Sequence, residues 1–119
     1  MGACSFHLSG YDEGSEFYNS KMVKARREHR CCECNKIIEK AEVHETVVGK
    51  WEGLIQRYRT CALCMEIRTK FGERGWLFGS VWDDIHEYLF PEMNFNCMEG
   101  LSPEARTRII ERWQKWKGL

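Results

Sequence analysis

The chain has 119 residues, enough for one domain, and its 18 lysines and arginines balance 18 aspartates and glutamates. A net charge of zero excludes a uniformly basic nucleic-acid coat, and 43% hydrophobic residues exclude a disordered chain. No apolar run approaches the roughly 20 residues of a membrane span, and no leader peptide is recognised, so a cytoplasmic protein without membrane contact is predicted. The charges are nevertheless segregated: residues 21–74 are basic, residues 75–101 acidic and residues 102–119 basic.

The first part of the chain is expected to be largely irregular. Residues 1–19 form an arm in which two glycines interrupt any regular pattern. A short basic helix is predicted over residues 21–30, with Asn19 or Ser20 as its cap. Residues 31–36 hold three cysteines in a stretch too tight for helix or strand, which predicts a metal-binding knuckle.

A β-hairpin and a helix are predicted next. Residues 42–48 and 54–60 have the composition of strands, and residues 49–53, with two glycines, form the loop between them. Thr60 is expected to cap a helix over residues 61–71, and one of the glycines that follow ends this helix.

Two further helices are predicted in the C-terminal part. Apolar side chains between Phe78 and Leu89 share one helical face, and Pro91 ends that helix because proline cannot continue it. The polar cluster of this helix is assigned to its solvated face: Asp83, Asp84, His86 and Glu87. Ser102 and Pro103 mark the start of the last, basic helix. Its apolar stripe consists of Ala105, Ile109, Trp113 and Trp116.

Seven cysteines are the most specific feature of the sequence. The pairs Cys31/Cys34 and Cys61/Cys64 each have two spacers and are separated by 26 residues, which predicts one tetrahedral four-thiolate zinc site. Such a site is structural because no ligand position remains for water or substrate. An iron–sulfur cluster is the alternative for the same ligands. Cys32 is an alternative to Cys31 as a metal ligand. Only one residue separates Cys32 from Cys34, however, and this spacing fits a knuckle poorly.

A second metal site is a weaker alternative. Cys4 and His7 have ligand spacing, and Cys97 or His29 would have to complete the set. Isolated cysteines and histidines more often belong to the core or the surface, so we expect one zinc ion.

A knuckle, a β-hairpin and a helix with the second cysteine pair follow each other as in a treble-clef zinc finger of the α+β class. The sequence resembles small zinc proteins encoded by bacteriophages and prophages over roughly residues 20–90. The segments that carry the resemblance are 25–34, 51–53, 58–64 and 78–82. It implies the fold and a phage origin, within a bacterial host, but no activity. We expect one domain with three parts: an arm (1–19), a zinc module (20–74) and a helical extension (75–119).

No complete catalytic set is found, so a non-enzymatic protein is predicted. HNH nucleases share the treble-clef scaffold but need His and Asn on the helix. His44 and Glu45 lie in the hairpin without such partners. An HNH-like nuclease remnant is therefore the least favoured function.

Binding of nucleic acid is the alternative function, because basic residues gather around the knuckle as phosphate contacts require. The candidate contacts are Lys21, Lys24, Arg26, Arg27, Arg30, Arg57 and Arg59. Trp51 and Tyr58 are candidates for stacking on bases. Six interleaved glutamates argue against this interpretation.

A protein partner is the function that the sequence favours. Five tryptophans and six phenylalanines are more than a small core needs, and aromatic residues dominate protein interfaces. We therefore predict a zinc-stabilised interaction module that acts on a host or phage protein as an inhibitor or adaptor. Counter-defence is one role that such a module would serve. Pairing of Trp113 and Trp116 between copies would give a homodimer.

Overall fold

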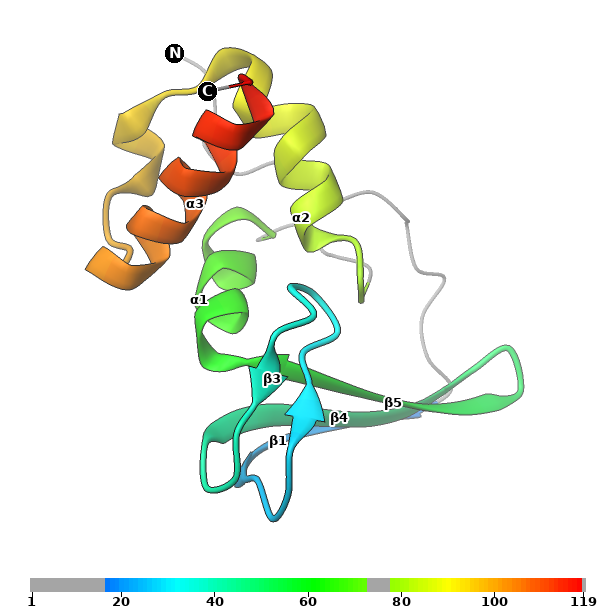
Figure 1. Cartoon of the computed structure of the whole chain (residues 1–119). Coiled ribbons are helices and arrows are strands. Elements are labelled where there is room, and N and C mark those ends of the chain that lie inside the picture. Colours follow the sequence, from blue (N-terminus) through cyan, green and yellow to red (C-terminus); the bar gives the residue numbers. More distant parts are fainter. Residues whose placement is uncertain (1–16, 73–77, 119) are drawn as a thin grey trace.

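The computed structural model describes residues 17–72 and 78–118 and shows an α+β architecture. Strands β1 (Phe17–Lys24), β4 (Val43–Trp51) and β5 (Leu54–Cys61) form an antiparallel sheet with the order β1-β4-β5. A second, two-stranded ribbon consists of β2 (His29–Arg30) and β3 (Ile37–Ile38). The loop between β2 and β3 is the predicted knuckle, and Figure 1 shows it turned toward the helices.

Helix α1 (Ala62–Phe71) follows β5 without a break and lies between the sheet and the C-terminal helices (Figure 1). Helix α2 (Val81–Asp84) continues as a π-helical segment, η1 (Ile85–Leu89). Two 3-10 turns, η2 (Phe90–Glu92) and η3 (Phe95–Met98), lead to α3 (Pro103–Trp116). None of the helices in the described part combines the length and apolar character that crossing a bilayer requires.

The predicted helix over residues 21–30 is wrong. Its first half belongs to β1, which pairs along β4 with Lys21 opposite Thr46 and Met22 opposite Glu45. The strand forms because β4 would otherwise leave one hydrogen-bonding edge without a partner, and this pairing overrides the helical preference of lysine and methionine. β1 also includes residues 17–19 of the predicted arm, and residues 1–16 lie outside the described part.

The two central strands are confirmed, but their connection is tighter than predicted. β4 and β5 extend to Trp51 and Leu54, so only Glu52 and Gly53 form the turn. Both turn residues have positive φ, 50° and 79°, as a two-residue type I′ turn requires. The expected five-residue loop fails because β4 and β5 stay paired up to the turn, with Trp51 opposite Leu54.

The three predicted helices are present with altered ends. Cys61, not Thr60, is the N-cap of α1, and Gly72 follows its last residue. The second helix begins at Val81 and ends in the turn that holds Pro91. Asp84 is only 1% exposed, so its assignment to a solvated face is wrong.

Helix α3 begins as predicted, because the Ser102 hydroxyl accepts a hydrogen bond from the Ala105 amide (3.2 Å). Ala105 and Ile109 are buried, whereas Trp116 is 46% exposed at the end of the stripe. Trp113 is partly buried against the same core, so only the last member of the stripe is largely exposed.

One apolar core joins the helices to the knuckle. Its fully buried members include Ile38 of β3, Ile67 of α1, Val81 of α2 and Ile109 of α3. Polar contacts fasten the same layers. Glu66 of α1 accepts hydrogen bonds from the amide and the hydroxyl of the α3 cap residue, at 2.5 and 2.8 Å.

The knuckle is fastened to the start of α2 by Glu33. Its carboxylate accepts hydrogen bonds from the amides of Gly79 (2.9 Å) and Val81 (3.1 Å). These amides have no partner inside the helix, so the carboxylate supplies a cap from a distant part of the chain. Burial raises the pKa of Glu33, and the two amides act in the opposite direction. The contact ties the helical extension to the metal-binding segment.

Candidate metal centre and basic groove

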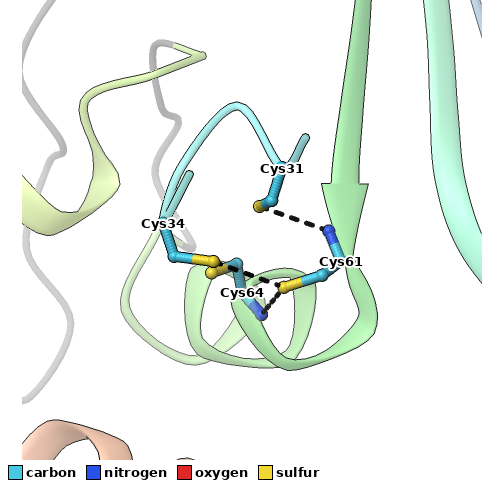
Figure 2. Close-up of side chains that lie close together, drawn as sticks. All are labelled: Cys31, Cys34, Cys61 and Cys64. Carbon is cyan, nitrogen blue, oxygen red and sulfur yellow. Dashed lines mark hydrogen bonds between the residues drawn. The ribbon is translucent and has the colours of Figure 1, made fainter. Parts of the chain in front are cut away.

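The four cysteines of the two predicted pairs come together in one cluster. Figure 2 shows Cys31 and Cys34 on the knuckle, Cys61 at the end of β5 and Cys64 in the first turn of α1. Their sulfur atoms all lie within 4.8 Å of one another. It is the one cluster of metal-binding side chains found among residues 17–72 and 78–118.

The knuckle has the backbone geometry that brings two thiols to one side. The Cys31 amide donates to the Lys36 carbonyl (2.9 Å), and the Asn35 amide donates back to the Cys31 carbonyl (3.0 Å). Asn35 adopts φ of 62°, and asparagine tolerates this left-handed conformation better than most residues. The Arg30 guanidinium donates to the Asn35 carbonyl (2.9 Å) and so closes the loop from outside.

The sulfur spacing fits a tetrahedral metal ion. Four thiolates about 2.3 Å from a zinc ion lie about 3.8 Å from one another. The Cys34 and Cys61 sulfurs are 3.8 Å apart (Figure 2). Because all four ligands are thiols, the donor set matches a closed structural site and leaves no position for a reacting molecule.

Four N–H groups point at the sulfurs and favour their ionised form. The amides of Glu33 and Cys61 donate to Cys31 Sγ, and the Cys64 amide donates to Cys61 Sγ, all at 3.4 Å. The fourth donor is Trp82 Nε1, at 3.4 Å from Cys64 Sγ. The Arg112 guanidinium lies 4.1 Å from the centre of the Trp82 ring. In the sequence, Trp82 belongs to the apolar face of a predicted helix. No sequence pattern indicates that its indole N–H donates to the sulfur of Cys64.

Position separates the cluster from the adjacent cysteine, Cys32. Within the cluster, hydrogen bonds to the other thiols, first to Cys31, lower the pKa of Cys34 and raise the pKa of Cys61 and of Cys64. Burial raises the pKa of Cys32 to about 12. The Cys32 sulfur lies outside the cluster, 3.4 Å from the Thr60 hydroxyl. The choice of Cys31 over Cys32 thus agrees with the geometry.

The residues weighed for other metal sites are engaged elsewhere or lie outside the described part. His44 is fully buried, with Nδ1 3.2 Å from the Glu42 carbonyl and Nε2 3.0 Å from the Arg59 guanidinium. Glu45 binds Arg68 of α1 through both carboxylate oxygens, each at 3.0 Å. These contacts assign the His44–Glu45 pair to packing and not to a nuclease metal. Residues 4 and 7 fall in the part that is not described.

A second feature is a groove of about 1000 Å³ on the opposite face of the sheet from α1. Its described lining includes seven lysines and arginines and no acidic residue. The seven cations of this basic groove are Lys21, Lys24, Arg26, Arg27, Lys40, Arg57 and Arg59. The remaining lining consists of one histidine, one threonine and small apolar side chains.

The strand alternation explains the floor of the groove. Lys21, Thr46 and Arg59 stand opposite one another across the three strands, and Val48 stands opposite Arg57 in the next row. These residues share one face because side chains alternate along a strand. Glu45 belongs to the other face, where it binds α1. None of the six interleaved glutamates is among the described lining residues of the groove.

Two loops form the rim. Ala25, between β1 and β2, donates its amide to the Glu42 carbonyl (3.0 Å) and accepts from the Ala41 amide (2.7 Å). Ala41 adopts φ of 76°, an uncommon conformation for alanine that these bonds help to hold. The joined loops place Arg26, Arg27 and Lys40 along the same cavity.

Ion pairs between described residues do not balance the positive charges of the groove. None of its lysines and arginines forms one with a carboxylate in the described part of the chain. The pKa of Arg59 is lowered by burial and then by Arg57 and Arg27, which repel its charge. The pKa of His29 is lowered in the same way, by burial first and by Arg59 next. The groove therefore carries a positive potential that a bound anion would relieve.

Six of the seven residues predicted to contact nucleic acid line this groove, while Arg30 holds the knuckle instead. Lys40 was missed because acidic neighbours surround it in the sequence. The two predicted stacking residues lie on the other face, where the Tyr58 ring stacks on Phe78 (4.6 Å) and Trp51 meets both edge-on. They cannot stack on a base bound in the groove.

Comparison of the chain with protein-family models, with curated proteins and with solved structures returns no match. The resemblance to phage zinc proteins therefore stays a prediction from the sequence. Two features of the structure therefore bear on its function. They are the four-cysteine cluster, which can hold one metal ion, and the basic groove.

Proposed function

We propose that the chain is a zinc-stabilised protein of the treble-clef class that binds nucleic acid in the basic groove. The observation that carries the proposal is the collection of seven cations in one concave surface whose described lining holds no acidic residue. Phosphate groups supply the complementary charge at high density, and neutralising them releases counterions. The zinc ion has a structural role, because it joins the C-terminal end of β5 to the knuckle, next to the groove. A phage origin is supported by the sequence resemblance alone.

The proposal predicts binding that weakens steeply with salt. A fluorescein-labelled 24-mer, in single-stranded and duplex form, is titrated with protein at 50 and 200 mM salt. With about five phosphate contacts, affinity should fall by roughly 10³-fold between these conditions. The double variant Arg27→Gln/Arg57→Gln should bind at least about tenfold more weakly at 50 mM salt, because two contacts are lost.

The matched control is Arg106→Gln/Lys115→Gln, which removes the same charge from α3, where neither residue lines the basic groove. This control should bind like the unchanged protein. Equal loss in both double variants would show that only net charge matters and would contradict a groove site. Absence of binding to all probes at 50 mM salt would overturn the proposal.

A protein partner is the second candidate, favoured by the end of the β4–β5 hairpin. Leu54 and Ile55 are 62% and 68% exposed there, and the hairpin extends away from the rest of the fold (Figure 1). Neighbouring exposed apolar side chains on a projecting turn are typical of an interaction site. An inhibitor or adaptor of a host or phage protein would use this end.

The two candidates are separated by affinity capture from nuclease-treated bacterial lysate. A protein that binds through the hairpin should be captured by the Arg27→Gln/Arg57→Gln variant and lost with Leu54→Ser/Ile55→Ser. Capture that both variants retain would exclude the hairpin end as the contact.

A further inference from the structure

We propose that the groove receives the phosphate ridge of a double helix and not a single strand. This inference rests on the proposed function and names the form of nucleic acid that the groove fits. Two observations support it: the kinds of side chain that line the groove, and the contacts that fix the Arg59 side chain on its floor.

The described lining lacks the surfaces on which unpaired bases stack. Its only ring is the imidazole of His29, which is half-buried and has the His44 ring 5.9 Å away. Single-strand binding grooves combine cations with aromatic side chains, and each base stacked on such a ring contributes about 1–3 kcal/mol. The chain has aromatic residues beside the sheet, but Trp51 and Tyr58 are packed on the opposite face. A single strand in the groove would be held by charge alone.

The floor presents one fixed charge, that of Arg59. Arg59 is half-buried, and its Nη1 donates to His44 Nε2 (3.0 Å) and to the Thr46 hydroxyl (3.1 Å). These contacts position the guanidinium, so it serves as a stationary charge and does not follow a flexible strand. The rim is fixed as well, through the bonds between Ala25 and Ala41.

A concave surface lined with cations, one of them fixed in place, is best matched by a rigid array of phosphates. A duplex carries about one charge per 1.7 Å of its axis, and its charge density makes counterion release larger than for a single strand. Its backbone is also a convex ridge, which enters a concave surface without requiring that any base leave the stack. Duplex DNA and duplex RNA share this ridge, and separate probes distinguish them.

The test compares four probes of one 24-nucleotide sequence by fluorescence anisotropy. The probes are duplex DNA, duplex RNA and the two corresponding single strands, each titrated between 50 and 200 mM salt. We expect at least one duplex to bind about tenfold or more tightly than its own strand. The logarithm of its affinity should fall with the logarithm of salt with a slope of about −5. Arg57→Gln should reduce that slope by about one, whereas Arg106→Gln should leave it unchanged.

The outcomes separate this inference from the proposed function. Single strands that bind as tightly as both duplexes, or more tightly, overturn the choice of a duplex and leave nucleic-acid binding in place. Absence of binding to all four probes overturns both. Each variant is first checked for one bound zinc ion and an unchanged melting temperature, so that loss of folding is not taken for loss of binding.

Discussion

Replacement of Cys64 by serine is expected to abolish zinc binding and with it the folded structure. The Cys64 side chain is fully buried and belongs to the four-sulfur cluster. A structural four-thiolate site contributes an apparent binding free energy on the order of 10 kcal/mol, comparable to the whole stability of a typical domain. Metal content by mass spectrometry, near-ultraviolet circular dichroism and a thermal melt measure the effect.

Cys32→Ser is the matched control, because it changes the same atom one residue away from the cluster. Cys32 lies beside the Thr60 hydroxyl, and we expect this variant to keep one zinc ion per chain and a cooperative melt. Strong chelation of the unchanged protein should reproduce the Cys64→Ser spectrum. A Cys64→Ser protein that melts like the unchanged chain would contradict a structural zinc site.

The second large effect is expected from Arg68→Ala. Arg68 and Glu45 are 3% and 7% exposed and form two parallel hydrogen bonds of 3.0 Å. The Ser20 hydroxyl also donates to Glu45 (3.0 Å), so the pair joins α1 to both β4 and β1. Removing one partner leaves a buried charge without compensation, which costs about 3–5 kcal/mol. Urea unfolding of the zinc-loaded protein measures this loss.

A double-mutant cycle separates the pair from the packing of either side chain. We expect Glu45→Leu/Arg68→Met to be much more stable than Glu45→Leu or Arg68→Met alone, because no buried charge remains. Arg106→Ala on the exposed surface of α3 is the control and should change the unfolding free energy by less than about 0.5 kcal/mol. A loss below about 1 kcal/mol in Arg68→Ala would show that the pair is solvated.

The four-cysteine cluster could be predicted because the short spacing within each cysteine pair is enough to identify it. Two cysteine pairs with fixed spacing define ligands, knuckle and helix start without knowledge of the rest of the fold. The last helix was equally predictable, since Ser102 and Pro103 carry their own capping chemistry. The added donor Trp82 was not, because its position depends on how α2 packs against α1.

For the groove, the sequence allowed us to predict most of the cations but not their arrangement on one surface. Four of its seven cations lie within residues 21–27, but a helix over residues 21–30 would have scattered these four around a cylinder. The register of β1 against β4 instead aligns Lys21 with Arg59 on one face and sends Glu45 to the other. Pairing between distant strands is set by tertiary contacts, which local preferences do not contain.

The two faces of the sheet give neighbouring residues of one strand different mutational constraints. Arg57 and Arg59 face the groove, while Tyr58 between them stacks against Phe78 and Thr60 is fully buried. An exchange at Arg57 alters the surface potential with little effect on packing, and exchanges at Tyr58 and Thr60 do the reverse. Within this strand the specificity of the groove can therefore diverge between related chains while the fold stays the same.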